Sequence, residues 1–185
     1  KENLSPAALM KEAISVLKGN IKPFNFPPIR TFQDGQNNFY HKDKLIELCP
    51  VELHLGKIAE SIETGEDYNI KIASNKFKNI IEKVVEMQRF EKANKCLVVI
   101  GNDFFNSEFD SMTHNKTPQQ NDVRYKTLFN TGLELYRDAL VTLREYFPCI
   151  DVMMCVGNHA RAMEFFMYVA LQASLERKST LQSSL

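Results

Sequence analysis

The sequence predicts an α/β domain, a partial sandwich in which a mostly parallel sheet carries helices on both faces. Short continuous apolar runs alternate along the chain with longer segments whose apolar residues recur every three or four positions. Such alternation is typical of parallel strands joined by crossover helices. With 185 residues, 44% hydrophobic and 25% charged, the chain is long and apolar enough for one folded domain.

The first 40 residues are predicted to form a helix and an arm apart from the domain. Residues 5–17 have Ser5 as a plausible N-cap, Pro6 at the first helical position and apolar residues at helical spacing. Residues 21–38, rich in Pro, Gly, Asn and Gln, are typical of a linker. The domain itself is expected over residues 41–185.

Within the domain, three strands alternate with three long helices. Residues 45–53 have strand length, and residues 96–100 and 150–156 form apolar runs typical of strands buried on both faces. The helices are predicted over residues 74–93, capped by Ser74, 122–147, capped by Asp122, and 161–177.

A polar motif follows each predicted strand. These motifs are Glu52-Leu53-His54, Gly101-Asn102-Asp103 and Gly157-Asn158-His159. Ligands of parallel α/β sheets bind beyond the carboxyl ends of the strands, so the three motifs are expected at one rim. Carboxylate, imidazole and amide groups are metal ligands. Each motif alone is more typical of an ordinary turn, and the three together predict a metal site.

In order and spacing, these motifs resemble those of the calcineurin-like metallophosphoesterases, which carry Asp-x-His, then Gly-Asp, then Gly-Asn-His followed by Asp or Glu. Residues 54–57, 101–106 and 117–119, with Arg124, look most like a phage-encoded, partly exonuclease-like branch of that superfamily. The resemblance covers about residues 45–165. It implies a partial metallophosphoesterase-like sandwich that is incomplete at its C-terminus.

The resemblance also implies a site with two divalent metal ions, manganese first and magnesium, iron or zinc as alternatives. Glu52 and His54 would hold the first ion, Asp103 would bridge both, Asn158 would bind the second, and His159 would be the catalytic residue at the scissile phosphate. Two cations roughly 3.5–4 Å apart clamp a phosphoryl group and make hydroxide available near neutral pH.

Two further residues are candidates for substrate binding. His114 lies in the polar loop after the second motif, and Arg124 opens the following helix, where a positive charge opposes the helix dipole. A solvated loop and a solvated helix face remain the alternatives for both.

The chain departs from the family pattern at three places. Glu52 stands where the family has Asp, Ala160 stands where it has an acidic residue, and no histidine follows His159. We therefore expect either the front part of a longer protein or a truncated member. Two functions stay open: a metal-dependent phosphoesterase or phosphodiesterase, a hydrolase with DNA as one candidate substrate, or a catalytically incomplete scaffold that binds metal weakly or a protein partner.

The composition of the chain restricts the kinds of partner and the surroundings that we expect for the protein. Lys+Arg and Asp+Glu are both 23, so the formal net charge is zero, which disfavours nucleic-acid binding through bulk positive charge. No apolar run reaches the roughly 18 residues of a membrane span. The four cysteines form no C-x-x-C pair and are expected to be buried, reduced thiols in the cytoplasm of a bacterium or a phage-infected cell. An unfinished sheet would expose an edge through which copies could associate.

Overall fold

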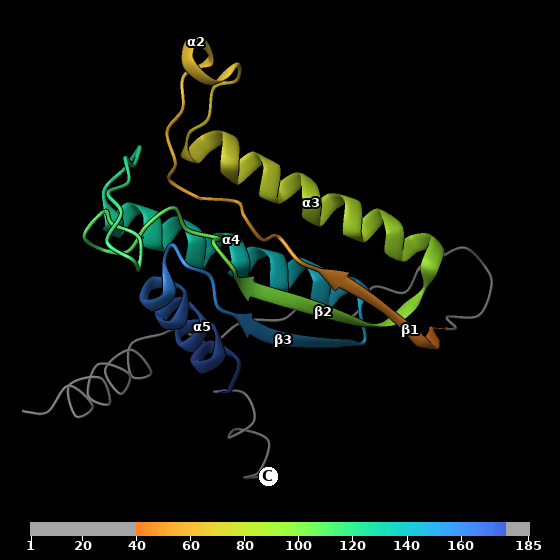
Figure 1. Ribbon diagram of the computed structural model, residues 1–185. Coiled ribbons are helices and arrows are strands. Elements are labelled where there is room, and N and C mark those ends of the chain that lie inside the picture. The colour runs from red at the N-terminus through yellow and green to blue at the C-terminus, as the bar shows by residue number, and fades with distance from the viewer. Residues whose placement is uncertain (1–39, 177–185) are drawn as a thin grey trace, which may run out of the picture.

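The computed structural model describes residues 40–176, so the predicted helix and arm before Tyr40 lie outside the described residues. Three strands and four helices follow one another in it (Figure 1). They are β1 (His41–Leu48), α2 (Ser61–Thr64), α3 (Ile70–Glu91), β2 (Ala93–Gly101), α4 (Tyr125–Tyr146), β3 (Cys149–Cys155) and α5 (Arg161–Glu176).

The three strands form one parallel sheet in the order β1-β2-β3. Leu48 pairs with Val98, which in turn pairs with Val152. The predicted α/β class with a parallel sheet flanked by helices is confirmed. All three arrowheads in Figure 1 point toward the side that holds the long loop between β2 and α4. The first strand ends at Leu48, short of its predicted end at residue 53, because Pro50 has no N–H to donate to a ladder.

The core lies between the sheet and the helices. Alternate strand residues such as Ile46, Val98 and Ile100 are buried against the helices, as period-two side-chain alternation requires. At the centre, the ring of Phe77 on α3 lies 5.1 Å from Tyr136 on α4 and 5.7 Å from Phe104, which follows β2. Fully burying one such ring stabilises the fold by about 1.5–3 kcal/mol. The loop after β2 is therefore fixed to both long helices.

Two predicted helix caps were wrong. The side chain of Asn69, not Ser74, caps α3 by accepting from the amide of Ile72 at 3.0 Å. The hydroxyl of Ser74 donates to the carbonyl of Ile70 inside the helix at 2.7 Å. Asp122 does not cap α4, because its carboxylate accepts from the amide of Ile70 at 2.9 Å. Asp122 thus ties the loop before α4 to the start of α3.

The third strand was predicted to be buried on both faces, and this was wrong. The residues of β3 are half-buried or exposed, and the Met153 side chain is 46% exposed. Within residues 40–176, β3 pairs only with β2 and forms an edge of the sheet. Apolar composition alone does not reveal whether a neighbouring strand or helix covers a strand.

Two expectations from composition were tested in part. All four cysteines are free thiols, but only Cys96 is buried, and Cys49 is exposed. In the described part of the chain, no helix combines the length and apolar character that crossing a bilayer requires.

Candidate functional site

The turns after the three strands meet at one rim of the sheet, as predicted. The amide of Glu52 donates to the carbonyl of Asn102 at 3.0 Å, and the amide of His54 donates to the carbonyl of Asp103 at 3.1 Å. The amide of Asn102 in turn donates to the carbonyl of Cys155 at 2.9 Å. These backbone bonds join the first turn to the second and the second to the third. We call Glu52, His54, Asp103, Asn158 and His159 the strand-end site.

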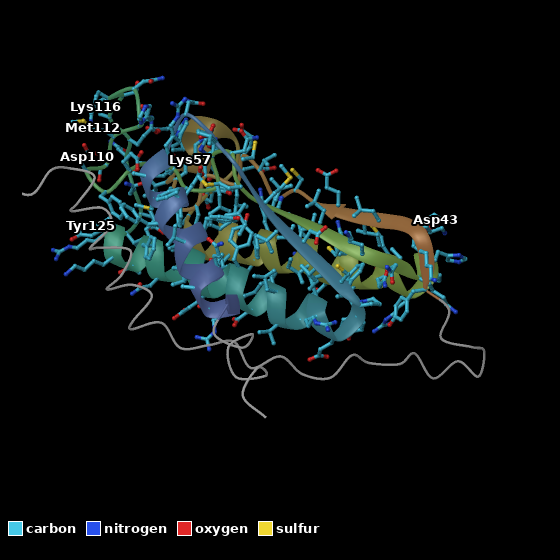
Figure 2. All side chains as sticks on the ribbon, turned by 90° about the horizontal axis from the view of Figure 1, so that it is seen from below. Asp43, Lys57, Asp110, Met112, Lys116 and Tyr125 are labelled. Carbon is cyan, nitrogen blue, oxygen red and sulfur yellow. The ribbon has the colours of Figure 1, made fainter. Side chains whose placement is uncertain are left out.

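The rim occupies one end of the molecule. Figure 2 shows Lys57, which follows the first turn, and Lys116, from the loop after β2, toward one end. Asp43, near the start of β1, lies at the opposite end. The parallel strands thus carry their amino ends away from the site and their carboxyl ends into it.

His54 lies at the centre of the site. Its Nε2 atom is 3.1 Å from Glu52 Oε2, and its ring centroid is 4.4 Å from that of His159. Burial, and next the nearby His159, lower the pKa of His54, although Glu52 opposes the shift. A neutral ring that donates from Nε2 to Glu52 has its lone pair on Nδ1. That Nδ1 atom is buried and has no hydrogen-bond partner in the part of the chain that the structure describes.

Asp103 is the most enclosed acid of the site, with only 4% of its surface exposed. Its Oδ1 atom accepts from the amide of His159 at 2.7 Å. The third turn approaches so closely that a Cβ atom on Gly157 would lie 2.2 Å from this oxygen. Glycine is therefore required at position 157, and the second and third turns hold each other.

The backbone around Asp103 is unusual. Gly101, Asn102 and Asp103 have φ of +100°, +51° and +64°, three successive residues in the left-handed region. For non-glycine residues this region costs roughly 1–2 kcal/mol each. Asn and Asp tolerate it better than other side chains do. With the backbone in this conformation, the Asp103 carboxylate lies against the third turn, at the amide of His159 and beside Gly157.

The orientation of His159 is fixed by one hydrogen bond. Its Nδ1 atom lies 2.7 Å from the carbonyl oxygen of Asn106. Since a carbonyl only accepts, Nδ1 carries the proton and donates, and Nε2 is the ring nitrogen left for chemistry. His159 is thus held in one tautomer by a residue for which the sequence predicted no role.

The weaker candidates lie around this centre. The Asn158 side chain is exposed. The backbone carbonyls of Asn158 and His159 both accept from the backbone amide of His114. The loop after β2 therefore packs on the third turn. The His114 ring is itself exposed, with Nδ1 4.0 Å from Glu108 Oε1. Arg124 is exposed at the N-cap of α4.

Sequence reasoning missed two acids that support the site. Glu108 caps α5 by accepting from the amides of Ala162 and Met163 at 3.0 and 3.1 Å. Glu164 is fully buried on α5 and accepts from the amide of Phe104 at 2.8 Å. Burial raises the pKa of Glu164 to about 7. For Glu164 the signal in the sequence was an acid within an otherwise apolar helix, whereas Glu108 lies in the loop after β2 and gave no such signal.

The fit of a metal to these residues is partial. A buried imidazole nitrogen without a partner, next to a carboxylate that holds the other ring nitrogen, is typical of metal-binding histidines. The buried carboxylate of Asp103 lies close enough to affect the pKa of His54. Within residues 40–176, however, no group of three or more His, Cys, Asp or Glu side chains is arranged to hold a metal ion.

A cavity of about 390 Å³ opens beside the first turn. Glu52 and His54 form part of its wall, together with Lys57, Tyr68 and Lys76. The ammonium of Lys76 lies 5.1 Å from the centroid of the Tyr68 ring, a cation–π contact. A molecule that reacts at His54 therefore has room beside it.

No family model, no curated protein and no solved structure matches the chain. The resemblance to the metallophosphoesterases therefore stays a prediction carried by the three motifs.

Proposed function

We propose that the protein is a metal-dependent phosphoesterase that hydrolyses phosphodiesters at the strand-end site. The observation that carries this proposal is the convergence of three turns distant in the sequence. They bring Glu52, His54, Asp103 and His159 into one continuous chain of contacts. The residue types are those that bind divalent cations and transfer protons, and they lie where parallel α/β sheets bind ligands.

Each residue has a role that follows from its environment. His54 Nδ1 and the carboxylate of Asp103 would hold the first cation, and Asp103 and Asn158 the second. Glu52 now accepts from His54 Nε2, so it would have to turn away from that nitrogen to become a ligand of the first cation. When bound, two such cations, with manganese the first candidate, neutralise phosphoryl charge and lower the pKa of water. His159 is held through Nδ1 by Asn106 and presents Nε2 toward the site. When Nε2 also carries a proton, the imidazolium would donate that proton to the leaving oxygen and return to the neutral ring protonated on Nδ1.

The substrate proposed is an extended phosphodiester, with DNA as one member of that class. The cavity beside Glu52 and His54 leaves room on one side of the reacting phosphate. Lys57 and Lys76 in its wall can neutralise a neighbouring phosphate. The zero net charge of the chain gives no further support for a nucleic acid.

Hydrolysis measurements test this function. The chain is incubated with manganese and with either bis-p-nitrophenyl phosphate or linear DNA, and Asp103→Asn and His159→Ala are the variants. Glu134→Gln, an exposed residue on α4, is the matched control. We expect hydrolysis that both site variants abolish and the control retains. Absence of hydrolysis, or hydrolysis indifferent to both variants, contradicts the proposal.

A second function, a catalytically incomplete scaffold, is favoured by a separate observation. No three potential ligands are arranged around one point among the described residues. In addition, β3 presents an edge to which a partner or a second copy could add a strand.

Calorimetric titration with manganese distinguishes the two functions. Tight binding at two sites supports the enzyme and contradicts the scaffold, whereas weak binding at a single site is expected of the scaffold. Light scattering tests the oligomer that the exposed edge predicts. A monomer at all protein concentrations contradicts association of copies through that edge.

A further inference from the structure

Glu164 is a buried acid that the proposed chemistry does not use, and no cation pairs with it within residues 40–176. It is completely enclosed on α5, and among the described residues its Oε2 atom has no hydrogen-bond partner. Burying a carboxyl group in this way is costly unless it makes a specific contact. The position therefore calls for an explanation beyond core packing, which an apolar residue would supply at lower cost.

The contact that Glu164 makes is with the backbone next to Asp103. Its Oε1 atom accepts from the amide of Phe104 at 2.8 Å. Its Oε2 atom lies 3.1 Å from the point where a Cβ atom on Gly101 would stand. The carboxyl group therefore lies against the left-handed turn of residues 101–103 and binds the first amide after it.

The third strand approaches the same turn at Gly101. A Cβ atom on Gly101 would lie 2.3 Å from the carbonyl oxygen of Cys155. The side chains of Phe104 and Phe105 are fully buried behind the turn. Glu164 supplies the polar anchor for an amide that this apolar packing cannot satisfy.

We propose that Glu164 is a positioning residue that fixes Asp103 in the strand-end site by anchoring the backbone amide of Phe104. The inference rests on the proposed function, because it concerns the metal affinity of that site. Residues that orient a metal ligand typically change affinity by about 10–100-fold when they are removed.

Three substitutions on α5 test the assignment by calorimetric titration with manganese. Glu164→Leu removes the acceptor, Glu164→Gln keeps an acceptor oxygen in the same shape, and Met167→Ala removes buried apolar packing on the same helix. We expect affinity to fall by about 10–100-fold for Glu164→Leu. Manganese affinity should be largely retained in Glu164→Gln and unchanged in Met167→Ala. We expect Met167→Ala to have a lower melting temperature, because it loses buried apolar packing.

A metal-free readout keeps the inference separable from the proposed function. The amide of His159 donates to Asp103, so its hydrogen exchange reports whether Asp103 is in place. Glu164→Leu should lose that protection, whereas Met167→Ala should keep it relative to its global stability. If the unaltered chain binds no manganese, the proposed function fails. The hydrogen exchange of the His159 amide then decides by itself whether Glu164 positions Asp103.

Two results would overturn the role of Glu164. One is a folded Glu164→Leu variant with unchanged manganese affinity and unchanged His159 protection. The other is a Met167→Ala variant that loses as much manganese affinity or as much His159 protection as Glu164→Leu does. In that case the loss in Glu164→Leu would be explained by lower stability of the fold and not by the position of Asp103. Should Glu164→Leu fail to fold, Glu164→Asp, whose carboxylate is one methylene too short to reach Phe104, takes its place with the same expected loss.

Discussion

The turn after β2 and the turn after β1 carry the two acids of the strand-end site in opposite environments. Asp103, after β2, is 4% exposed and is held by an amide from the third turn. The Glu52 side chain, after β1, is 61% exposed, and its contact is with His54. Asp103 is thus enclosed by its surroundings, whereas most of the Glu52 side chain faces solvent.

This difference shows which of the two positions can hold a longer acidic side chain. At position 52 the Glu side chain is 61% exposed, and its carboxylate contacts His54. At position 103 a longer side chain would clash with the third turn, because Gly157 lies so close to the Asp103 carboxylate that even a Cβ atom would not fit between them. The predictions below test this contrast from the largest expected effect to the smallest.

Gly157→Ala should have the largest effect. Its Cβ atom would lie 2.2 Å from Asp103 Oδ1 and 2.5 Å from the backbone nitrogen of Asp103, and neither atom can move freely. Overpacking of this kind typically costs 1–3 kcal/mol, and here we expect about 3 kcal/mol or more. Urea unfolding measures it. Stability equal to that of the unaltered chain would show that the second turn is as adaptable as the first.

The raised pKa of Glu164 should make the stability of the metal-free protein depend on pH. The pKa of Glu164 is raised from 4.5 to about 7 in the folded state, so between these values the folded chain keeps a proton that the unfolded chain has lost. The free energy of unfolding should therefore fall by up to about 3 kcal/mol as the pH rises through that window, and then level off.

Unfolding of Glu164→Gln across the same pH range is the control. The Gln variant cannot ionise and should lack this part of the decline, while the contributions of His54 and other groups remain. Parallel stability profiles for the two proteins would contradict the buried, raised-pKa state of Glu164.

Gly132→Ala tests the packing behind the second turn. A Cβ atom on Gly132 of α4 would lie 2.4 Å from the Phe105 ring and 3.0 Å from that of Phe104. Alanine gains about 1 kcal/mol in helix propensity, so a net loss of about 1–2 kcal/mol is expected by urea unfolding. A stabilised variant would show that the two rings do not pin the turn against α4.

Glu52→Gln should have the smallest effect on stability, below about 0.5 kcal/mol, because the side chain is exposed. Its effect should appear in His54 instead. Glu52 raises the pKa of His54 against the lowering by burial, so the substitution should lower that pKa further. An NMR titration of the His54 ring measures the change, and an increase would contradict the contact.

The sequence predicted the strands and the meeting of the three turns, because continuous apolar runs and strand-end motifs are local signals. It did not predict that Asp122 accepts from the amide of Ile70, since a contact across 52 residues depends on tertiary structure. The cap at Asn69 is local, three residues before Ile72, and was missed because Ser74 was predicted to be the cap. Nor did the sequence identify Glu164, whose role follows from an amide 60 residues earlier in the chain. The residue pattern thus indicates where the strand-end residues lie. The residues that hold them in place depend on packing between distant segments, which the pattern does not show.

Paramagnetic broadening of the histidine ring signals by manganese tests the central claim most directly. The chain has four histidines: His54 and His159 in the site, His114 on its surrounding loop, and His41 at the start of β1. A cation held by the strand-end site should broaden His54 and His159 at the lowest manganese concentrations and leave His41 sharp. Uniform broadening of all four, or broadening that begins at His41 or His114, would contradict a cation site at the meeting of the three turns.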